Sequence, residues 1–409
     1  MDLRQAADII IDQAIRAVLP DEAVKNALAG KDFPGRVILV AAGKAAWQMA
    51  KTASDNLVDR ITMGIVITKY HHVMGPIPLL DCREAGHPVP DENSFSATQA
   101  ALDLVKDLDS TDTVLFLLSG GGSALFEKPL IPGDQLQDIT WQLLACGADI
   151  VEINTIRKRL SAVKGGRFAQ LCAPAQVYAI VLSDVLGDPL DMIASGPAYP
   201  DQSTCQQAVA IAEKYNLNLS REARQLLEVE TPKVLTNVVT RIGGSVRQLC
   251  QGVADACREL GYEPILLTDQ LCCQAKDAGS MLASQAKTHL GQGKKVALLA
   301  GGETVVQLIG QGLGGRNQEL ALAAAAELDG LSGVCVFSVG SDGTDGPTDA
   351  AGGYVDGKTA GKLRSQGIEI MDVLKNNDAY HALQKADGLI ITGPTGTNVN
   401  DVAVALIDG

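Results

Sequence analysis

The chain has 409 residues, of which 46% are hydrophobic and 20% are charged. This length exceeds one typical domain, and the apolar content is enough for two buried cores. The 34 basic and 48 acidic residues give a net charge of -14, which argues against nucleic-acid binding because that requires a basic face. No segment approaches the roughly 20 consecutive apolar residues needed to span a bilayer, and residues 1–19 resemble an amphipathic helix rather than a signal peptide.

Apolar runs and helical periodicity alternate along the chain. Continuous apolar runs predict buried strands at residues 37–41, 65–68, 113–118, 177–182, 264–267, 296–300, 334–339 and 389–392. Apolar residues at helical spacing predict helices at residues 2–19, 93–108, 204–228, 245–260, 275–290 and 316–328. This alternation predicts an α/β fold in two domains, each with a mostly parallel sheet flanked by helices.

The predicted domains are a Rossmann-like N-terminal domain, residues 1–232, and a smaller C-terminal domain, residues 233–409. The boundary is placed at Thr231–Pro232, where a long polar helix ends. A last helix over residues 400–407 could pack on the first domain. The nine cysteines lack metal-ligand spacing, and we expect reduced, buried thiols in a cytoplasmic protein.

Two strand-to-helix turns in the first domain suit an anion. After residues 37–41, Gly43 permits a tight turn and places Lys44 in the first helical turn, where a cation is unfavourable unless an anion is near. The turn after residues 113–118 offers bare backbone N–H groups at a helix start, through Ser119, Gly120, Gly121, Gly122 and Ser123. It lacks the Lys-Ser or Lys-Thr of a Walker A loop. The alternatives to anion binding are an ordinary tight turn for the glycines and a solvated side chain for Lys44.

A basic segment and a pair of carboxylates follow. Residues 153–175 contain no acid but five cations, at Arg157, Lys158, Arg159, Lys164 and Arg167. We expect this segment, Lys164 included, to bind phosphate, although a solvated or ion-paired helix face is the alternative. Asp184 and Asp188 lie after the strand at 177–182, where they could hold Mg²⁺, accept a substrate proton, or form a turn.

The second domain repeats this arrangement of polar residues at strand ends. Glu303 follows one strand, and Arg316 opens a helix after two glycines, where it is suited to bidentate binding of a carboxylate or phosphate. Asp342 and Asp345 follow another strand within GSDGTDGPTDAAGG, which suggests Mg²⁺ or the polar groups of a small substrate, or a surface turn. Asn398, after the last predicted strand, could line a cleft.

Nine segments together resemble the MOFRL-type glycerate 2-kinases, a family sometimes labelled hydroxypyruvate reductase. They are AAGKAAW, EAGHPVPDENS, LSGGGSAL, INTIRKRLSAVKGGR, LSDVLGDPLDMIASGP, AGGETVV, GLGGRNQELALA, SDGTDGPTDAAG and TGPTGTNVND. The resemblance covers nearly the whole chain. It implies a two-domain enzyme, with a MOFRL-type C-terminal domain and its active site between the domains. The implied reaction is ATP- and Mg²⁺-dependent phosphorylation of D-glycerate to 2-phosphoglycerate.

The resemblance places functional positions on residues quoted above, and physical reasoning suggests their roles. Lys44, Asp184 and Arg316 would be catalytic, while the Ser119–Ser123 loop and Lys164 would hold the phosphates. The substrate-binding candidates are Arg316, Glu303, Asn398 and Asp342, and the metal candidates are Asp184, Asp188 and Asp345. The expected partners are therefore small molecules, D-glycerate and ATP, with neither nucleic acid nor membrane, and the chain acting as a monomer or homodimer.

Two other functions compete with this interpretation. A reductase acting on hydroxypyruvate would need a GxGxxG fingerprint directly after a strand, and neither the glycines after residues 113–118 nor GLGGRN meets that requirement. A non-catalytic sensor of a sugar acid or nucleotide would need fewer charged residues at strand ends than the chain carries.

Overall fold

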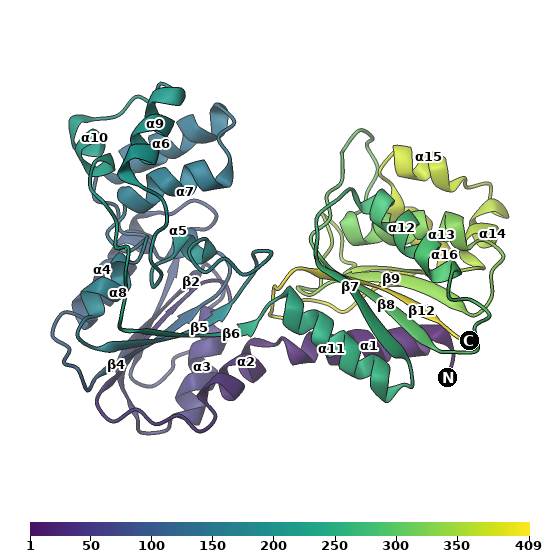
Figure 1. Ribbon diagram of the computed structural model, residues 1–409, viewed down its shortest axis with the longest axis horizontal. Helices are drawn as coiled ribbons and strands as arrows, with labels where there is room; N and C mark the ends of the chain where they lie inside the picture. The colour runs from purple at the N-terminus through teal and green to yellow at the C-terminus, as the bar shows by residue number, and fades with distance from the viewer. The chain divides into compact units, whose positions relative to one another are not determined.

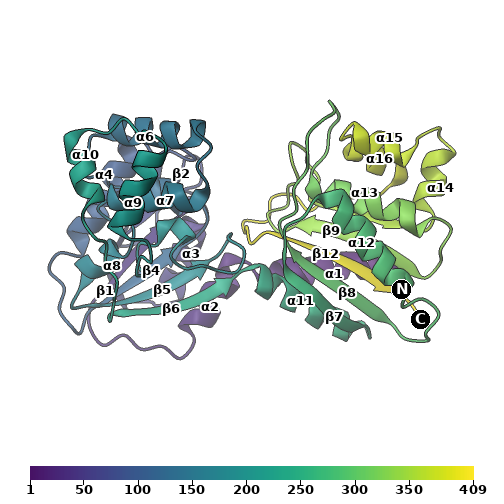
Figure 2. The same cartoon turned by 45° about the horizontal axis from the view of Figure 1, so that its top comes forward.

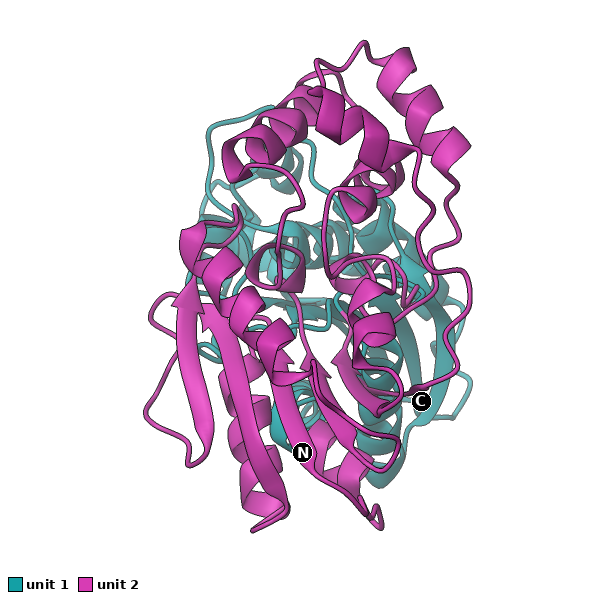
Figure 3. Cartoon of the chain, turned by 90° about the vertical axis from the view of Figure 1, so that its left-hand side faces the viewer, with its two compact units in different colours: residues 1–22, 184–187, 244–409 teal, residues 23–183, 188–243 magenta.

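The computed structural model describes residues 1–409 and divides into two compact units (Figure 3). The first-sheet unit comprises residues 23–183 and 188–243, and the second-sheet unit comprises residues 1–22, 184–187 and 244–409. Each unit contains one six-stranded sheet (Figure 1). The prediction of a two-domain α/β fold is confirmed.

The first sheet has the strand order β3-β2-β1-β4-β5-β6, and the pairs from β3 to β5 are all parallel. Its strands are β1 (Val37–Ala42), β2 (Ile61–Lys69), β3 (Leu80–Ala85), β4 (Thr113–Leu118), β5 (Gln176–Leu182) and β6 (Val238–Gly244). β1 and β4 are buried at every residue, as expected for central strands covered on both faces. Because neighbouring strands are parallel, the loops after β1 and β4 leave the sheet at the same edge.

Helices cover both faces of the first sheet. The helices are α2 (Pro20–Leu28), α3 (Ala46–Asn56), α4 (Glu92–Leu104), α5 (Gly122–Leu125), α6 (Gly133–Ala145), α7 (Ile150–Arg159), α8 (Arg167–Cys172), α9 (Cys205–Lys214) and α10 (Arg221–Leu227), with a short 3₁₀ helix, η1 (Ile193–Ser195). α2 and α3 bury apolar side chains against one face. On the other face, Phe168 of α8 packs on Phe116 of β4 with ring centroids 4.9 Å apart. α6, α7, α9 and α10 lie together (Figure 2), and their apolar side chains form a separate cluster.

The second sheet has the order β11-β10-β9-β12-β8-β7. Its strands are β7 (Glu263–Leu271), β8 (Val296–Gly302), β9 (Val334–Gly340), β10 (Gly352–Asp356), β11 (Leu389–Ile390) and β12 (Asp401–Ile407). β7 and β8 are parallel, while β12 is antiparallel to both β8 and β9. β10 is antiparallel to β9 and β11, so β7, β8, β9 and β11 share one direction and β10 and β12 run opposite.

Two helix layers sandwich the second sheet (Figures 1 and 2). The helices are α1 (Leu3–Ala17), α11 (Val246–Glu259), α12 (Ala275–Lys287), α13 (Arg316–Leu328), α14 (Thr359–Arg364), α15 (Ile370–Lys375) and α16 (Ala379–Ala386). One face packs against α1 and α11, and the other against α12, α13 and the last three helices. Neighbouring residues of β8 alternate between these two cores, with Ala297 and Leu299 in one and Val296 and Leu298 in the other.

Two sequence predictions need correction. Residues 400–407 were expected to form a helix on the first domain, but β12 occupies a central position in the second sheet, fully buried between β8 and β9. Its apolar run is short, and such a run does not distinguish a strand from a helix. The boundary between the compact units along the chain lies at residues 243–244 rather than 232–233. In addition, α1 belongs to the second-sheet unit, because Ile10 and Ile11 pack in its core.

None of the helices is both long and apolar enough to cross a lipid bilayer. The nine cysteines are all unpaired; four are buried, while Cys146, Cys272 and Cys273 are exposed, so the expectation of buried thiols holds only in part.

Candidate active site

The loops that follow β1 and β4 are joined by hydrogen bonds at the carboxyl edge of the first sheet. The backbone N–H of Lys44 donates to the Gly120 carbonyl at 2.9 Å, and the N–H of Ala45 donates to Ser119 Oγ at 3.1 Å. Ser119 is 3% exposed, so its hydroxyl supports the start of α3 from beneath. A Cβ at position 43 would lie 2.2 Å from that hydroxyl, which explains the glycine at this turn. The two turns that the sequence singled out are thus one connected structure.

His87 belongs to this structure, although the sequence analysis gave it no role. It lies after β3, and a Cβ at Gly121 would lie 3.1 Å from His87 Nε2 and 3.2 Å from Lys44 Cγ. The imidazole and the lysine stem therefore both pack beside Gly121, which has φ +85°. Burial, and then the nearby Lys44 charge, lower the pKa of His87, which favours the neutral ring. In the sequence His87 appeared only within EAGHPVPDENS, one of the segments that carry the family resemblance.

Lys164 supports the glycine loop from inside the protein, which corrects its predicted role as a phosphate ligand. The side chain is fully buried, and its Nζ donates to the carbonyls of Ser123 at 2.8 Å and Phe126 at 3.1 Å. It also forms an ion pair with the fully buried Glu127 at 3.4 Å. Burial lowers the pKa of Lys164 to about 8, against the opposing effect of Glu127. Arg157 completes this cluster, since Nη2 donates to the Ser123 carbonyl at 3.1 Å.

The other cations of the basic segment also have internal partners. Lys158 is 3% exposed and forms ion pairs with Asp191 and Asp201, both at 3.2 Å. Arg159 is fully buried and donates to the Ser203 hydroxyl at 2.9 Å. Arg167 donates to backbone carbonyls between residues 158 and 161. The sequence pattern therefore reflects a buried ionic network rather than an exposed anion-binding patch.

The loop after β5 carries Asp184 and Asp188 and ends in a strained turn. Asp188 has φ +53°, and its Oδ1 is buried without a hydrogen-bond partner. Ala194 and Ser195 have φ values of +51° and +60°, a conformation that costs energy for residues other than glycine. Ser195 Oγ donates to Asn154 Oδ1 at 2.9 Å and lies 3.2 Å from Ser123 Oγ. The strained turn thus contacts the end of the glycine loop.

A second cluster, which we call the Arg316 cluster, comprises Glu303, Arg316 and Asp401. In register, Asp401 of β12 pairs with Gly302 of β8 and Gly340 of β9, so it lies between the two strand ends. The Arg316 guanidinium forms a bidentate ion pair with Asp401, with Nη2 3.0 Å from Oδ1, and its Nη1 donates to Glu303 Oε1 at 2.7 Å.

The Arg316 guanidinium is held by two ion pairs, yet its side chain remains partly exposed to solvent. Burial acts to lower the pKa of Arg316, but Asp401 and Glu303 more than offset this effect and raise it. Burial also raises the pKa of Asp401, against the effect of Arg316. The Arg316 side chain is 35% exposed, whereas that of Asp401 is 8% exposed. Asp401 therefore fixes the plane of a guanidinium that solvent still reaches. The sequence pattern indicated Arg316 and Glu303 here, whereas Asp401 appeared only within the segment TGPTGTNVND.

Asp345 caps α13, which corrects its predicted role as a metal ligand. Its Oδ1 accepts from the N–H of Asn317 at 3.1 Å and its Oδ2 from the N–H of Gln318 at 2.9 Å. Burial raises the pKa of Asp345 to about 6, against these two hydrogen bonds. Both oxygens thus serve the first turn of the helix that carries Arg316. Nowhere in residues 1–409 do three or more His, Cys, Asp or Glu side chains gather closely enough to hold a metal ion.

Asp342 and Asn398 lie on the loops beside the Arg316 cluster. Asp342 Oδ1 accepts from the N–H of Thr344 at 3.0 Å. A Cβ at Gly340 would lie 3.4 Å from both Asp342 Oδ1 and Asp401 Oδ1, so these two carboxylates approach the same strand end. Asn398 is partly exposed on the loop before β12. Next to it, Asn400 has φ +67°, and its buried Nδ2 has no hydrogen-bond partner.

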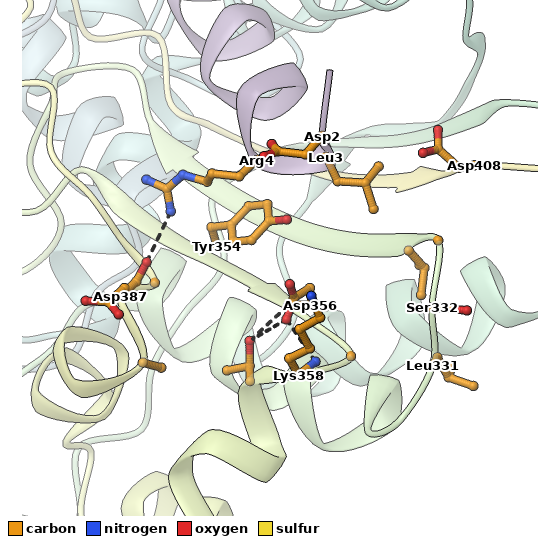
Figure 4. A pocket seen from close by; sticks show the side chains of 16 residues that line it. Asp2, Leu3, Arg4, Leu331, Ser332, Tyr354, Asp356, Lys358, Asp387 and Asp408 are labelled. Atoms are coloured by element: carbon orange, nitrogen blue, oxygen red, sulfur yellow. Dashed lines mark hydrogen bonds between the residues drawn. The ribbon is translucent and has the colours of Figure 1, made fainter.

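Two cavities of the second-sheet unit differ in their relation to these residues. One, of about 560 Å³, lies beside the start of β9, and Arg4, Tyr354 and Asp356 are among the residues that line it (Figure 4). There Arg4 of α1 donates to the Leu389 carbonyl at 3.1 Å, and its guanidinium lies 5.0 Å from the centre of the Tyr354 ring. These two contacts help to hold α1 against the rest of the unit. The other, of about 660 Å³, includes Glu303, Arg316 and Asp345 in its wall. Only this second cavity adjoins predicted site residues.

Comparisons with known proteins identify the family of the chain. Residues 6–228 match a family described as a domain of unknown function (DUF4147), and residues 296–401 match the MOFRL family. The D-glycerate 2-kinase of Thermotoga maritima is 52% identical, over 99% of this chain and 98% of its own. The glycerate 2-kinase of Pyrococcus horikoshii is 39% identical, over 100% and 98%.

A relative in Agrobacterium vitis with the provisional name hydroxypyruvate reductase is 37% identical, over 99% of this chain and 94% of its own. The crystal structure of glycerate kinase from Thermotoga maritima is similar with a TM-score of 0.95 and 51% identity, and the match covers 99% of each chain. The chain therefore belongs to the MOFRL-type glycerate 2-kinase family.

Proposed function

We propose that the protein is a glycerate 2-kinase, which transfers the γ-phosphoryl group of ATP to the 2-hydroxyl of D-glycerate and forms 2-phosphoglycerate and ADP. The observation that carries this proposal is the Arg316 cluster, a partly exposed guanidinium fixed by Asp401 at two strand ends. Such a guanidinium is suited to bidentate contact with a carboxylate or a phosphoryl group. The 52% identity to a D-glycerate 2-kinase supports the choice of acceptor.

The connected turns of the first sheet would hold phosphate oxygens. Lys44 makes no ion pair in the structure and packs beside Gly121 with His87, whose pKa is lowered by burial and by the Lys44 charge. In this proposal the Lys44 ammonium neutralises charge on the transferring group, and His87 donates or accepts one hydrogen bond beside it. Phosphoryl transfer depends on position and charge neutralisation more than on a strong base. The buried Lys164 and Arg157 would then fix the loop rather than contact the nucleotide.

The Arg316 cluster would bind the carboxylate of D-glycerate or the transferring phosphoryl group. Glu303 limits how far the guanidinium can move, and Asp342 and Asn398 would contact substrate hydroxyls from neighbouring loops. We further propose that the two sets of residues act on the same pair of substrates.

Asp184 and Asp188 would hold Mg²⁺, which when bound to ATP neutralises phosphate charge. Asp188 fits this role because its Oδ1 is buried without a hydrogen-bond partner. Asp345 does not fit, since both of its oxygens accept N–H groups from α13. Asp184 could alternatively accept the proton of the substrate hydroxyl. Because all nine cysteines are unpaired, we also propose the cytoplasm as the place of action.

The proposal is tested with purified protein, D-glycerate, ATP and Mg²⁺, following ADP. Glycerate-dependent ADP release supports a kinase. If ADP is absent and NADH or NADPH is oxidised when hydroxypyruvate is added, the protein is a reductase instead. Saturable binding of glycerate or ATP with neither reaction would indicate a sensor. Lys44→Met is the matched inactive control, because Lys44 is partly exposed and its loss creates no buried unpaired charge.

A further inference from the structure

The 660 Å³ cavity beside the Arg316 cluster has no role in the mechanism above. Its wall is formed by residues of the segment 303–315 after β8, the start of α13, residues 345–347, Leu186 and residues near α16. Pockets of 300–1,000 Å³ typically hold small organic ligands, so about 660 Å³ is ample for a nucleoside and far more than D-glycerate needs. All of the lining residues belong to the second-sheet unit.

The glycine-rich segment of the wall is held in place by hydrogen bonds to residues 376–378. The N–H groups of Ile309 and Gly310 both donate to Asn377 Oδ1 at 2.9 Å. The N–H of Leu313 donates to Asp378 Oδ1 at 3.0 Å. These amides are therefore unavailable to a phosphate, although the glycines resemble a phosphate-binding loop. The wall of the cavity is therefore preformed, and it does not offer these N–H groups to an anion.

The charges and apolar side chains of the wall favour an uncharged ligand. Leu308 is 80% exposed and Val305 is 49% exposed, and both line the cavity. Exposed apolar side chains around a cavity are a feature of ligand-binding grooves. Glu303, Glu319 and Asp345 also line it, against one cation, Arg316. Away from Arg316, the carboxylates of this interior would repel a triphosphate, whereas a flat heterocycle would cover the apolar side chains.

Glu319 offers an unused hydrogen-bond acceptor. The side chain is 4% exposed, and its Oε2 accepts from Asn377 Nδ2 at 3.2 Å. A carboxylate can accept about four hydrogen bonds, so Glu319 has capacity left for an N–H donor on a ligand that enters the cavity. Burial raises the pKa of Glu319, consistent with its apolar surroundings. The ligand that fits therefore carries an N–H group.

We propose that this cavity binds the nucleoside end of the phosphoryl donor. The base lies against Val306 and Leu308, its amino or ring N–H donates to Glu319, and the phosphates leave the cavity past Arg316. The identification of the ligand as ATP rests on the proposed kinase function, but the preference for an uncharged, N–H-bearing heterocycle rests on the cavity alone. The probes are therefore adenosine, which has no phosphate, and inorganic triphosphate, which has no base.

The test compares two tryptophan substitutions in one segment. Val306→Trp fills the cavity, whereas Ile309→Trp is the matched control, because Ile309 is 66% exposed and does not line it. We expect the wild type to bind adenosine saturably in calorimetry and Val306→Trp to weaken that binding at least tenfold. The variant should raise KM for ATP tenfold or more and leave KM for D-glycerate and triphosphate binding within twofold. Ile309→Trp should change none of these values.

Leu308→Ser is a second cavity variant that keeps the test valid if Val306→Trp misfolds. Its own effect on folding should be small, since an 80% exposed side chain contributes little to stability. It should weaken adenosine binding severalfold at an unchanged melting temperature. Absence of adenosine binding, or an unchanged KM for ATP in both cavity variants, overturns the proposal even if the protein proves to be a kinase. Adenosine binding that Val306→Trp abolishes supports the cavity assignment even if glycerate is not phosphorylated, so the two proposals can fail separately.

Discussion

Replacing Lys164 by methionine separates a structural role from phosphate binding. In the structure the Lys164 ammonium contacts the Ser123 and Phe126 carbonyls and Glu127, all on the inner side of the glycine loop. Lys164→Met leaves Glu127 fully buried, with Arg157 as its remaining ion-pair partner at 3.6 Å. Removing one member of a buried ion pair typically costs about 3–5 kcal/mol. We expect a loss of that size in the free energy of unfolding of the first-sheet unit.

The pH dependence of the free energy of unfolding provides a second quantity that can be measured. Burial lowers the pKa of Lys164 from 10.5 to about 8, a difference that corresponds to about 3 kcal/mol. The folded pKa lies below the unfolded one, so the folded protein binds fewer protons between pH 8 and 10.5. The cost of burying the charge is therefore present at pH 7 and is relieved as pH rises through that window. Relative to Lys164→Met, the wild type should gain stability between pH 8 and 10.5.

Urea unfolding monitored by circular dichroism, at pH 7 and at several values up to pH 10, measures both effects. The double variant Lys164→Met/Glu127→Gln should be more stable than Lys164→Met alone, because it no longer buries an unpaired carboxylate. If Lys164→Met instead unfolds within 0.5 kcal/mol of the wild type while KM for ATP rises tenfold, Lys164 is a phosphate ligand and our interpretation of the buried cluster is incorrect.

Three further substitutions test the proposed roles. Arg316→Ala should lower kcat/KM for D-glycerate at least 100-fold and also destabilise the protein by leaving Asp401 buried and unpaired; adding Asp401→Asn should restore stability in thermal melts but not turnover. Lys44→Met should lower kcat by about 100- to 1,000-fold at an unchanged melting temperature, and a loss of stability instead would mean that the lysine is structural. Asp184→Asn should reduce Mg²⁺-dependent turnover in a metal titration, and near-wild-type kinetics would exclude Asp184 from the site.

The sequence predicted the elements that have one unambiguous pattern. The runs at residues 37–41 and 113–118 form fully buried parallel strands, as expected, because continuous apolar runs of that length suit strands covered on both faces. β12 was misassigned since a run of seven residues with Ala and Leu among its Val and Ile residues fits a helix equally well. α1 was recognised as a helix, but its packing in the second-sheet unit depends on contacts with α11, which are distant in sequence.

Site prediction failed where burial decides the role. Lys164 and Arg159 looked like exposed cations, yet both are fully buried, and sequence alone did not reveal the carboxylates Glu127 and Asp201 that lie beside them. Asp345 looked like a metal ligand because residue type does not distinguish an oxygen ligand from a helix cap. His87 was missed because its neighbours, Gly121 and Lys44, come from other strand ends.

The most direct test of the central claim follows ADP release and couples the phosphorylated product to enolase. Enolase consumes 2-phosphoglycerate but not 3-phosphoglycerate. Purified protein is incubated with D-glycerate, ATP and Mg²⁺, and phosphoenolpyruvate is measured against ADP. A glycerate 2-kinase produces phosphoenolpyruvate in proportion to ADP, up to the enolase equilibrium, with enolase as the only coupling enzyme. ADP without phosphoenolpyruvate would place the phosphate on the 3-hydroxyl, and no ADP together with hydroxypyruvate-dependent oxidation of NADH or NADPH would contradict the kinase assignment.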